Sequence, residues 1–153
     1  MNNHEDPTKQ SGQDSHGLVF PPEFSRTALP ANTEETARKT VDCAFRVHLA
    51  LGPGLLESVY EVCLCHELHK SGLAFERQVS MPVLYDGLRL DAGLRLDVVV
   101  SGCVIVELKA VEQILPVHKA QMLTYLKLSG IRLGLLINFN VPTIKTGIQR
   151  IIL

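Results

Sequence analysis

The stretch that most constrains the fold is VIVELKAV, residues 104–111, an apolar run that contains Glu107 and Lys109. Side chains two positions apart on a β-strand point to the same face of the sheet. Glu107 and Lys109 therefore share one face of a strand whose other residues favour burial. Opposite charges in such a strand indicate either a structural ion pair or a functional site.

A second carboxylate, Asp97, lies in the preceding apolar run RLDVVV, residues 95–100. Ser101 and Gly102 separate the two runs and predict a two-residue turn, which pairs Val100 with Cys103. This register places Asp97 within one step of residue 107 on the neighbouring strand. The sequence therefore predicts that two carboxylates converge on one part of the sheet.

Two converging carboxylates repel each other unless a positive charge lies between them. Lys109 can supply that charge as the centre of a buried ion-pair network. A divalent cation can also supply it, because Mg²⁺ prefers oxygen ligands and keeps several waters. The residues alone favour a structural ion pair and a metal site equally.

The hydrophobic periodicity predicts an α+β domain with a mixed sheet. We expect a flexible N-terminal tail over residues 1–32, which are polar and aperiodic, and a domain over residues 33–153. The Asp86-Gly87 pair is a strong hairpin signal. The predicted helices are 33–51, 55–70 and 117–128, and the predicted strands are 75–85, 88–100, 103–111, 131–138 and 148–153. The second helix is predicted to bury the apolar stripe Leu56, Val59, Tyr60, Cys63, Leu64 and Leu68.

Composition excludes several classes of protein. The chain has 153 residues, of which 46% are hydrophobic, as expected for one globular domain. No apolar run approaches the length of a membrane span, and the N-terminus does not resemble a signal peptide, so a cytoplasmic location is expected. A net charge of −1 gives no indication of a nucleic-acid partner. The four cysteines predict free thiols rather than disulfides.

Three motifs of the sequence resemble those of one known group of proteins. Asp97 followed by Glu107-Leu108-Lys109 resembles the D…(D/E)xK core of the PD-(D/E)xK nuclease superfamily. The segment QMLTY, residues 121–125, resembles the QxxxY element of RecB-type nuclease domains. The segment GLLESVY, residues 54–60, fits the pattern GxxExxY. Residues 33–153 thus resemble the GxxExxY protein family, a branch of that superfamily. The resemblance implies a restriction-endonuclease-like α-βββ-α-β core.

The resemblance also implies roles for individual residues. Asp97, Glu107 and the Leu108 carbonyl would bind Mg²⁺ or Mn²⁺. Lys109 would orient the attacking water and stabilise charge on the phosphate. The implied reaction is hydrolysis of phosphodiester bonds in nucleic acid, DNA being the expected substrate, and a homo-oligomer is the expected assembly. Glu57 and Gln121 would complete the catalytic site. Tyr125 would pack or form a hydrogen bond behind Gln121 and help to bind the substrate.

The residues outside the Asp97 and Glu107-Leu108-Lys109 core also have simpler interpretations. Glu57 could be favoured only by the dipole at a helix N-terminus. Gln121 and Tyr125 could line one side of an amphipathic helix. His118 could contact phosphate or remain solvated, and Arg95 could pair with a carboxylate or with a phosphate.

The same alternatives extend to function. The chain could be an active nuclease, or a non-catalytic protein that keeps the nuclease fold and binds nucleic acid or assembles with itself. A hydrolase of nucleotides or other phosphates would use the same metal site. Nothing in the residues distinguishes DNA from RNA.

Overall fold

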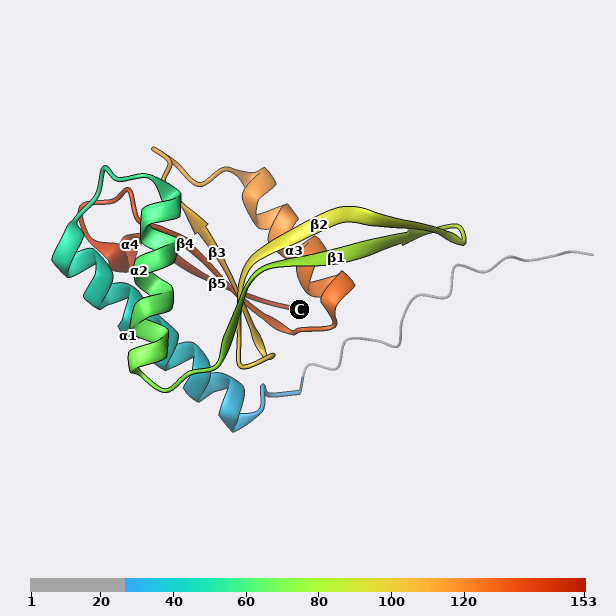
Figure 1. The fold of residues 1–153 in the computed structure, drawn as a ribbon, viewed down its shortest axis with the longest axis horizontal. Helices are drawn as coiled ribbons and strands as arrows, with labels where there is room; N and C mark the ends of the chain where they lie inside the picture. Colours follow the sequence, from blue (N-terminus) through green and yellow to red (C-terminus); the bar gives the residue numbers. More distant parts are fainter. Residues whose placement is uncertain (1–26) are drawn as a thin grey trace, which may run out of the picture.

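The computed structural model describes residues 27–153, without the side chain of Ala92. The predicted tail therefore lies outside the described residues up to position 26. No helix of the described part combines the length and the apolar character that a membrane span requires. The elements are α1 (Ala31–Leu51), α2 (Glu57–Lys70), β1 (Phe75–Tyr85), β2 (Leu88–Val100), β3 (Val104–Lys109), α3 (Pro116–Ser129), β4 (Leu133–Asn138), α4 (Ile144–Gly147) and β5 (Ile148–Ile152) (Figure 1).

The strands form one five-stranded sheet in the order β1-β2-β3-β4-β5. Strands β3 and β4 are parallel, and the other three pairs are antiparallel, so the predicted mixed sheet is confirmed. Helix α3 is the crossover that joins the two parallel strands, as parallel pairing requires. All residues of β4 are buried, as predicted for a strand that is covered on both faces.

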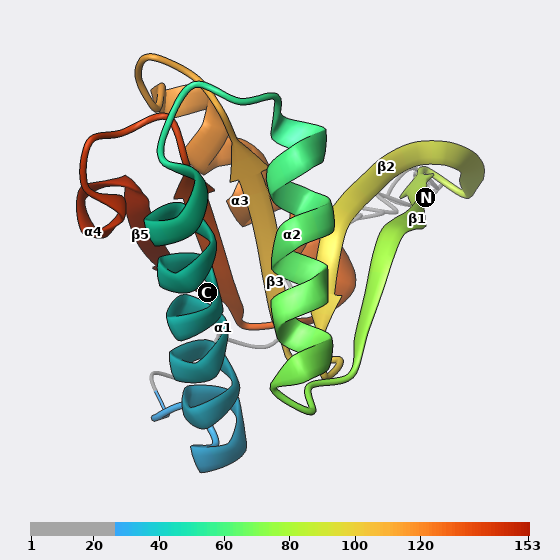
Figure 2. The same ribbon diagram turned by 60° about the vertical axis from the view of Figure 1, so that its left-hand side comes forward.

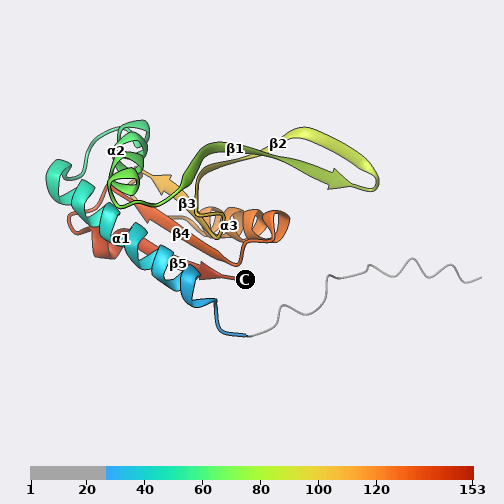
Figure 3. The ribbon, with the colours of Figure 1, turned by 60° about the horizontal axis from the view of Figure 1, so that its bottom comes forward.

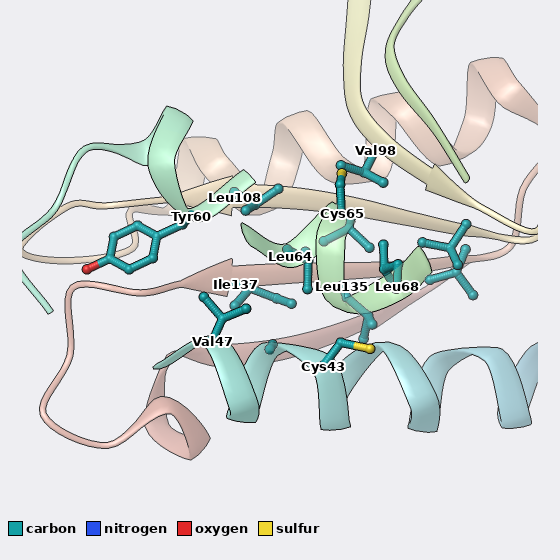
Figure 4. Close-up of a cluster of buried hydrophobic side chains, with 14 of the residues drawn as sticks. Cys43, Val47, Tyr60, Leu64, Cys65, Leu68, Val98, Leu108, Leu135 and Ile137 are labelled. Carbon is teal, nitrogen blue, oxygen red and sulfur yellow. The ribbon is translucent and has the colours of Figure 1, made fainter. Parts of the chain in front are cut away.

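Helices cover the sheet on both sides. Helices α1 and α2 lie side by side over one face (Figure 2), and α3 lies against the other face (Figure 3). The larger core cluster joins α1 and α2 to the sheet through side chains such as Leu64, Leu68 and Leu135 (Figure 4). Full burial of each such leucine contributes about 2 kcal/mol to folding. A smaller cluster joins α3 to the sheet through Met122, Leu126 and Leu136.

Strands β1 and β2 continue past the body of the sheet as a long hairpin arm (Figure 1). The predicted Asp86-Gly87 turn is confirmed, and both residues have positive φ, 46° and 75°. Two consecutive left-handed residues are the signature of the type I′ turn that suits a twisted hairpin. Four large apolar side chains near the tip are exposed: Leu84, Tyr85, Leu88 and Leu90.

The predicted two-residue turn between β2 and β3 is wrong. The connection has three residues, 101–103, and Val100 pairs with Val104 rather than with Cys103. Ser101 and Gly102 both take positive φ, 49° and 65°, and the third residue is needed to close the loop. This register carries Val98 to Val106, so the next position on each strand brings Asp97 opposite Glu107.

The helix starts also differ slightly from the prediction. Helix α1 begins at Ala31 after Pro30, and helix α2 begins at Glu57 rather than at residue 55. The predicted stripe on α2 is confirmed at Tyr60, Leu64 and Leu68, and the buried face also includes Cys65. Leu56, which precedes the first turn, and Val59 are exposed instead, and Cys63 is only partly buried.

Candidate functional site

The site lies where β2 and β3 separate. Their backbone pairing ends at Val98 and Val106. Beyond that point the Asp97 N–H donates a 3.2 Å hydrogen bond to Oε1 of Glu107, and the Leu108 N–H donates a 3.0 Å hydrogen bond to Oδ2 of Asp97. Side-chain carboxylates thus satisfy the backbone donors that the diverging strands no longer satisfy, as buried N–H groups require.

Glu107 carries the strongest electrostatic perturbation in this region. It is 4% exposed. Burial raises the pKa of its carboxyl group to about 8, and the negative charge of Asp97 adds to the increase, while Lys109 and the Asp97 N–H oppose it. A carboxyl group held in this way binds a proton at neutral pH unless a cation takes the place of the proton.

Lys109 shares the Glu107 face of β3, as the strand period predicts. Among the ion pairs of residues 27–153 none includes Lys109. The predicted alternative of a close structural ion pair is therefore absent from the described residues. The ammonium group lies near the carboxylates without being bound to one of them.

Glu57 approaches Asp97 and Lys109 from the helical layer that covers the sheet. It is the first residue of α2. Partial burial raises the pKa of its carboxyl group, the charges of Asp97 and Glu61 raise it further, and Lys109 lowers it. The first turn of α2 therefore points its carboxylate toward the charges of β2 and β3.

Tyr60, the tyrosine of the GxxExxY pattern, supports this helix start. Its hydroxyl group donates a 2.6 Å hydrogen bond to the Gly52 carbonyl and accepts a 3.1 Å hydrogen bond from the Leu55 N–H. Its ring is fully buried and stacks on Phe139 at 4.6 Å between centroids. Tyr60 is thus a core residue that fastens the loop before Glu57, and Gly54, at φ 97°, lets that loop turn.

Helix α3 contributes Tyr125 to the neighbourhood of the carboxylates. Tyr125 is 6% exposed, and burial together with the charges of Glu107 and Asp97 raises the pKa of its phenol. Gln121, one turn earlier on the helix, is exposed, and within residues 27–153 its side chain makes no hydrogen bond to another residue. The structure therefore places one member of the QxxxY pair near the carboxylates and leaves the other at the surface.

The two remaining predicted residues have other surroundings. His118 caps α3, because its Nδ1 accepts a 3.0 Å hydrogen bond from the Leu115 N–H. Arg95 pairs with Ser80 in the β1–β2 ladder and is exposed. Within residues 27–153 no ion pair joins Arg95 to either carboxylate.

Sequence reasoning missed Glu61, which lies one helical turn after Glu57 and is 6% exposed. Arg77 Nε donates to its Oε1 at 3.0 Å, and Gln78 Nε2 donates to its Oε2 at 2.8 Å. The spacing of four residues between two glutamates on α2 could have indicated it. Its partners could not have been identified, because they lie on a different element.

Nothing in the sequence indicated that Asn138 supports the site. It pairs with Lys109 in the parallel ladder and is 2% exposed. Its Oδ1 accepts hydrogen bonds from the N–H groups of Val111 and Asn140, at 3.1 and 3.2 Å, and its Nδ2 donates to the Val111 carbonyl at 2.9 Å. Asn138 therefore holds the chain that leaves β3 directly after Lys109.

A mixed five-stranded sheet between helices, with paired carboxylates and a lysine where two strands separate, is the arrangement of a nuclease-type fold. The family model described as PD-(D/E)XK nuclease superfamily matches residues 34–151, so the chain belongs to this superfamily. No curated protein and no solved structure matches the chain. Within residues 27–153, no three His, Cys, Asp or Glu side chains form a group that could hold a metal ion.

Proposed function

We propose that the chain is a nuclease that uses a divalent metal ion to hydrolyse phosphodiester bonds, with DNA as its substrate, and that it belongs to the GxxExxY branch of the superfamily. One observation carries the proposal. Asp97 and Glu107 lie opposite each other at the point where β2 and β3 separate, and Lys109 lies on the same face. The superfamily match supports the nuclease class.

The donor set fits a hard cation such as Mg²⁺ or Mn²⁺. Two carboxyl groups lie together with little solvent around Glu107, and no ion pair of the described residues joins Lys109 to either of them. Carboxylate oxygens are the ligands that Mg²⁺ prefers, and Mg²⁺ completes its octahedron with water. Asp97 and Glu107, together with the carbonyl oxygen of Leu108, would hold the ion.

The ion, when bound, supplies positive charge to the phosphate and lowers the pKa of its water. The Lys109 ammonium would donate a hydrogen bond to the phosphate and orient the attacking water. Glu57 would accept a hydrogen bond from a water on the α2 side. Gln121 would contact the phosphate from α3, and Tyr125 would pack behind Glu107. His118 and Arg95, both at the surface, would contact the DNA backbone farther from the scissile bond.

The test is cleavage of single-stranded, double-stranded and branched DNA with Mg²⁺ or Mn²⁺. Lys109→Ala is expected to reduce the rate by at least about 100-fold, because positioned groups that act on the reacting water contribute at least that much. Asp97→Asn is expected to abolish metal binding, as measured by calorimetry. Lys127→Ala, on the exposed side of α3, is the matched control and should retain full activity. A wild-type protein that neither cleaves these substrates nor binds metal contradicts the proposal.

A second function is favoured by a separate observation. The arm exposes Leu84, Tyr85, Leu88 and Leu90, and such apolar surface is typical of a contact with another protein. Together with a net charge of −1, it supports a self-assembling or nucleic-acid-binding protein that keeps the fold without catalysis. We propose a homo-oligomer under both functions.

Light scattering and a DNA-binding assay at rising salt separate the two functions. Binding through phosphates must weaken as the salt concentration rises. A large assembly that does not bind DNA, with no cleavage, supports the non-catalytic alternative. A Leu88→Asp variant should shift the assembly toward smaller species if the arm forms the contact.

We further propose a cytoplasmic location for the domain of residues 33–153. All four cysteines of this domain are free thiols. Free thiols are typical of a reducing compartment. Measurement of the protein in separated cell fractions tests the location.

A further inference from the structure

Glu61 is a buried carboxylate on the second turn of α2, and both of its oxygens are bound. Arg77 Nε donates to one oxygen at 3.0 Å, and Gln78 Nε2 donates to the other at 2.8 Å. A buried charge is tolerated only when it is paired and hydrogen-bonded, and this one is both. The two donors come from adjacent positions of β1.

Adjacent residues of a regular strand point to opposite faces, so they cannot both reach one carboxylate. Gln78 resolves this conflict by taking a φ of 52°, in the left-handed region that is unfavourable for a residue with a side chain. The distortion turns Gln78 to the side of Arg77. Backbone strain of this kind persists only where surrounding contacts hold it, and here the contact is Glu61.

The backbone distortion at Gln78 lies next to the candidate site. Arg77 pairs with Val98 and Val79 pairs with Leu96, so Gln78 lies opposite Asp97. Glu61 follows Glu57 by four residues, which places both carboxylates on one side of α2. The contacts of Glu61 therefore connect the helix that carries Glu57 to the strands that carry Asp97.

Apolar packing already holds α2 on the sheet, since Tyr60, Leu64 and Leu68 are fully buried. A buried ion pair is rarely required for stability, because apolar replacements of similar volume are often tolerated. What apolar packing does not determine is the rotation of the first turn of α2, and a two-oxygen contact determines orientation well.

We propose that Glu61 is a positioning residue, and that its contacts with Arg77 and Gln78 set the position of Glu57 relative to Asp97 and Glu107. This inference rests on the proposed metal-dependent function. Residues that orient the groups around a metal typically affect its affinity by about tenfold or more.

The experiment compares Glu61→Met, Glu61→Gln and Glu67→Met. Glu61→Met keeps the volume and removes both hydrogen bonds. Glu61→Gln can accept from Arg77 and donate to Gln78 once the Gln78 amide is reversed, so it retains both contacts. Glu67→Met is the matched control, because Glu67 lies on the same helix and pairs with Arg46 and Lys70 at its surface.

Calorimetry with Mn²⁺ alone and DNA cleavage at saturating substrate are the readouts, with thermal unfolding beside them. We expect Glu61→Met to lower Mn²⁺ affinity and the cleavage rate by about tenfold or more. Glu61→Gln should recover most of both, and Glu67→Met should match the wild type. If Glu61→Met does not fold, Gln78→Gly serves instead, since it removes one donor and relieves the left-handed strain.

Wild-type Mn²⁺ affinity in Glu61→Met overturns the inference and leaves the proposed function intact. If the wild-type protein binds no Mn²⁺, the proposed function fails, and amide hydrogen exchange then decides whether the contacts orient the helix. Faster exchange confined to residues 57–60 in Glu61→Met supports the positioning role. Unchanged exchange there overturns it.

Discussion

Asp97 and Glu107 each bind the backbone of the other's strand. Glu107 accepts a hydrogen bond from the Asp97 N–H, and Asp97 accepts one from the Leu108 N–H. The reciprocal contact keeps two carboxyl groups together, and burial with the charge of Asp97 keeps a proton on Glu107 at neutral pH. Release of that proton leaves two like charges at this point of the sheet, which a cation can stabilise.

The first prediction concerns the pH dependence of stability without metal. The folded protein holds a proton on Glu107 up to a pH of about 8, whereas the unfolded chain releases it near pH 4.5. The unfolded state thus binds fewer protons between these values, and stability falls as the pH rises through this window. In EDTA, Glu107→Gln should be more stable than the wild type at pH 8 by at least about 1 kcal/mol.

Urea unfolding at pH 5 and pH 8 measures this difference. At pH 5 the variant and the wild type should be close, because Glu107 is then neutral in the folded state. Equal stability at both pH values would contradict the raised pKa. Added Mn²⁺ should stabilise the wild type and not the variant.

The second prediction concerns Asn138, which holds the chain after Lys109 through three hydrogen bonds. Asn138→Ala leaves the partly buried N–H and C=O groups of Val111 and the N–H of Asn140 without their side-chain partner. We expect the free energy of unfolding to fall by about 2–3 kcal/mol. Asn140→Ala is the control, because only the backbone of Asn140 takes part, and its effect on chemical denaturation should be small.

The third prediction concerns Gly147, at the end of α4. A Cβ atom there would meet the carbonyl oxygen of Asn138 and the Val141 side chain. Because the oxygen belongs to the backbone, β4 and α4 must move apart, and we expect Gly147→Ala to cost about 1–3 kcal/mol. Lys145→Ala, on the exposed side of the same turn, should leave the thermal midpoint nearly unchanged, and an equal effect of both would contradict the packing argument.

The fourth prediction concerns the thiols. Burial raises the pKa of Cys65 to about 11, so only about one thousandth of this thiol is ionised at pH 8. Cys43 is fully buried, whereas Cys63 and Cys103 are partly exposed. Ellman's reagent at pH 8 should modify Cys63 and Cys103 first, with Cys43 and Cys65 reacting only in guanidinium. Mass spectrometry identifies the modified residues, and early labelling of Cys65 would contradict the burial.

Much of the fold could be predicted from local signals. The alternation in residues 88–100, the Asp86-Gly87 pair and the apolar run of residues 131–138 each have a direct physical cause, and each element is present, the last as the strand β4 that begins two residues later. The prediction that Glu107 and Lys109 share one face of the strand required only the two-residue period of a β-strand. The family match supports the nuclease class that the motifs predict.

The remaining features depend on tertiary structure. Serine gives no signal for the left-handed φ of Ser101, so the three-residue loop and its register could not be predicted. Gln78 likewise carries no marker for its φ of 52°, which its contact with Glu61 maintains. The exposed position of Gln121 depends on the angle at which α3 lies on the sheet, and periodicity does not report that angle.

The site draws its groups from three layers, with Glu57 above the sheet, Asp97 and Glu107 within it and Tyr125 below. The β2–β3 hairpin alone brings two carboxylates and Lys109 together, but nothing in it orients them against a helix. Contacts between residues far apart in the chain form late in folding. A nascent or partly unfolded copy would therefore lack the proposed activity, because Glu57, Asp97, Glu107 and Tyr125 come together only in the folded chain.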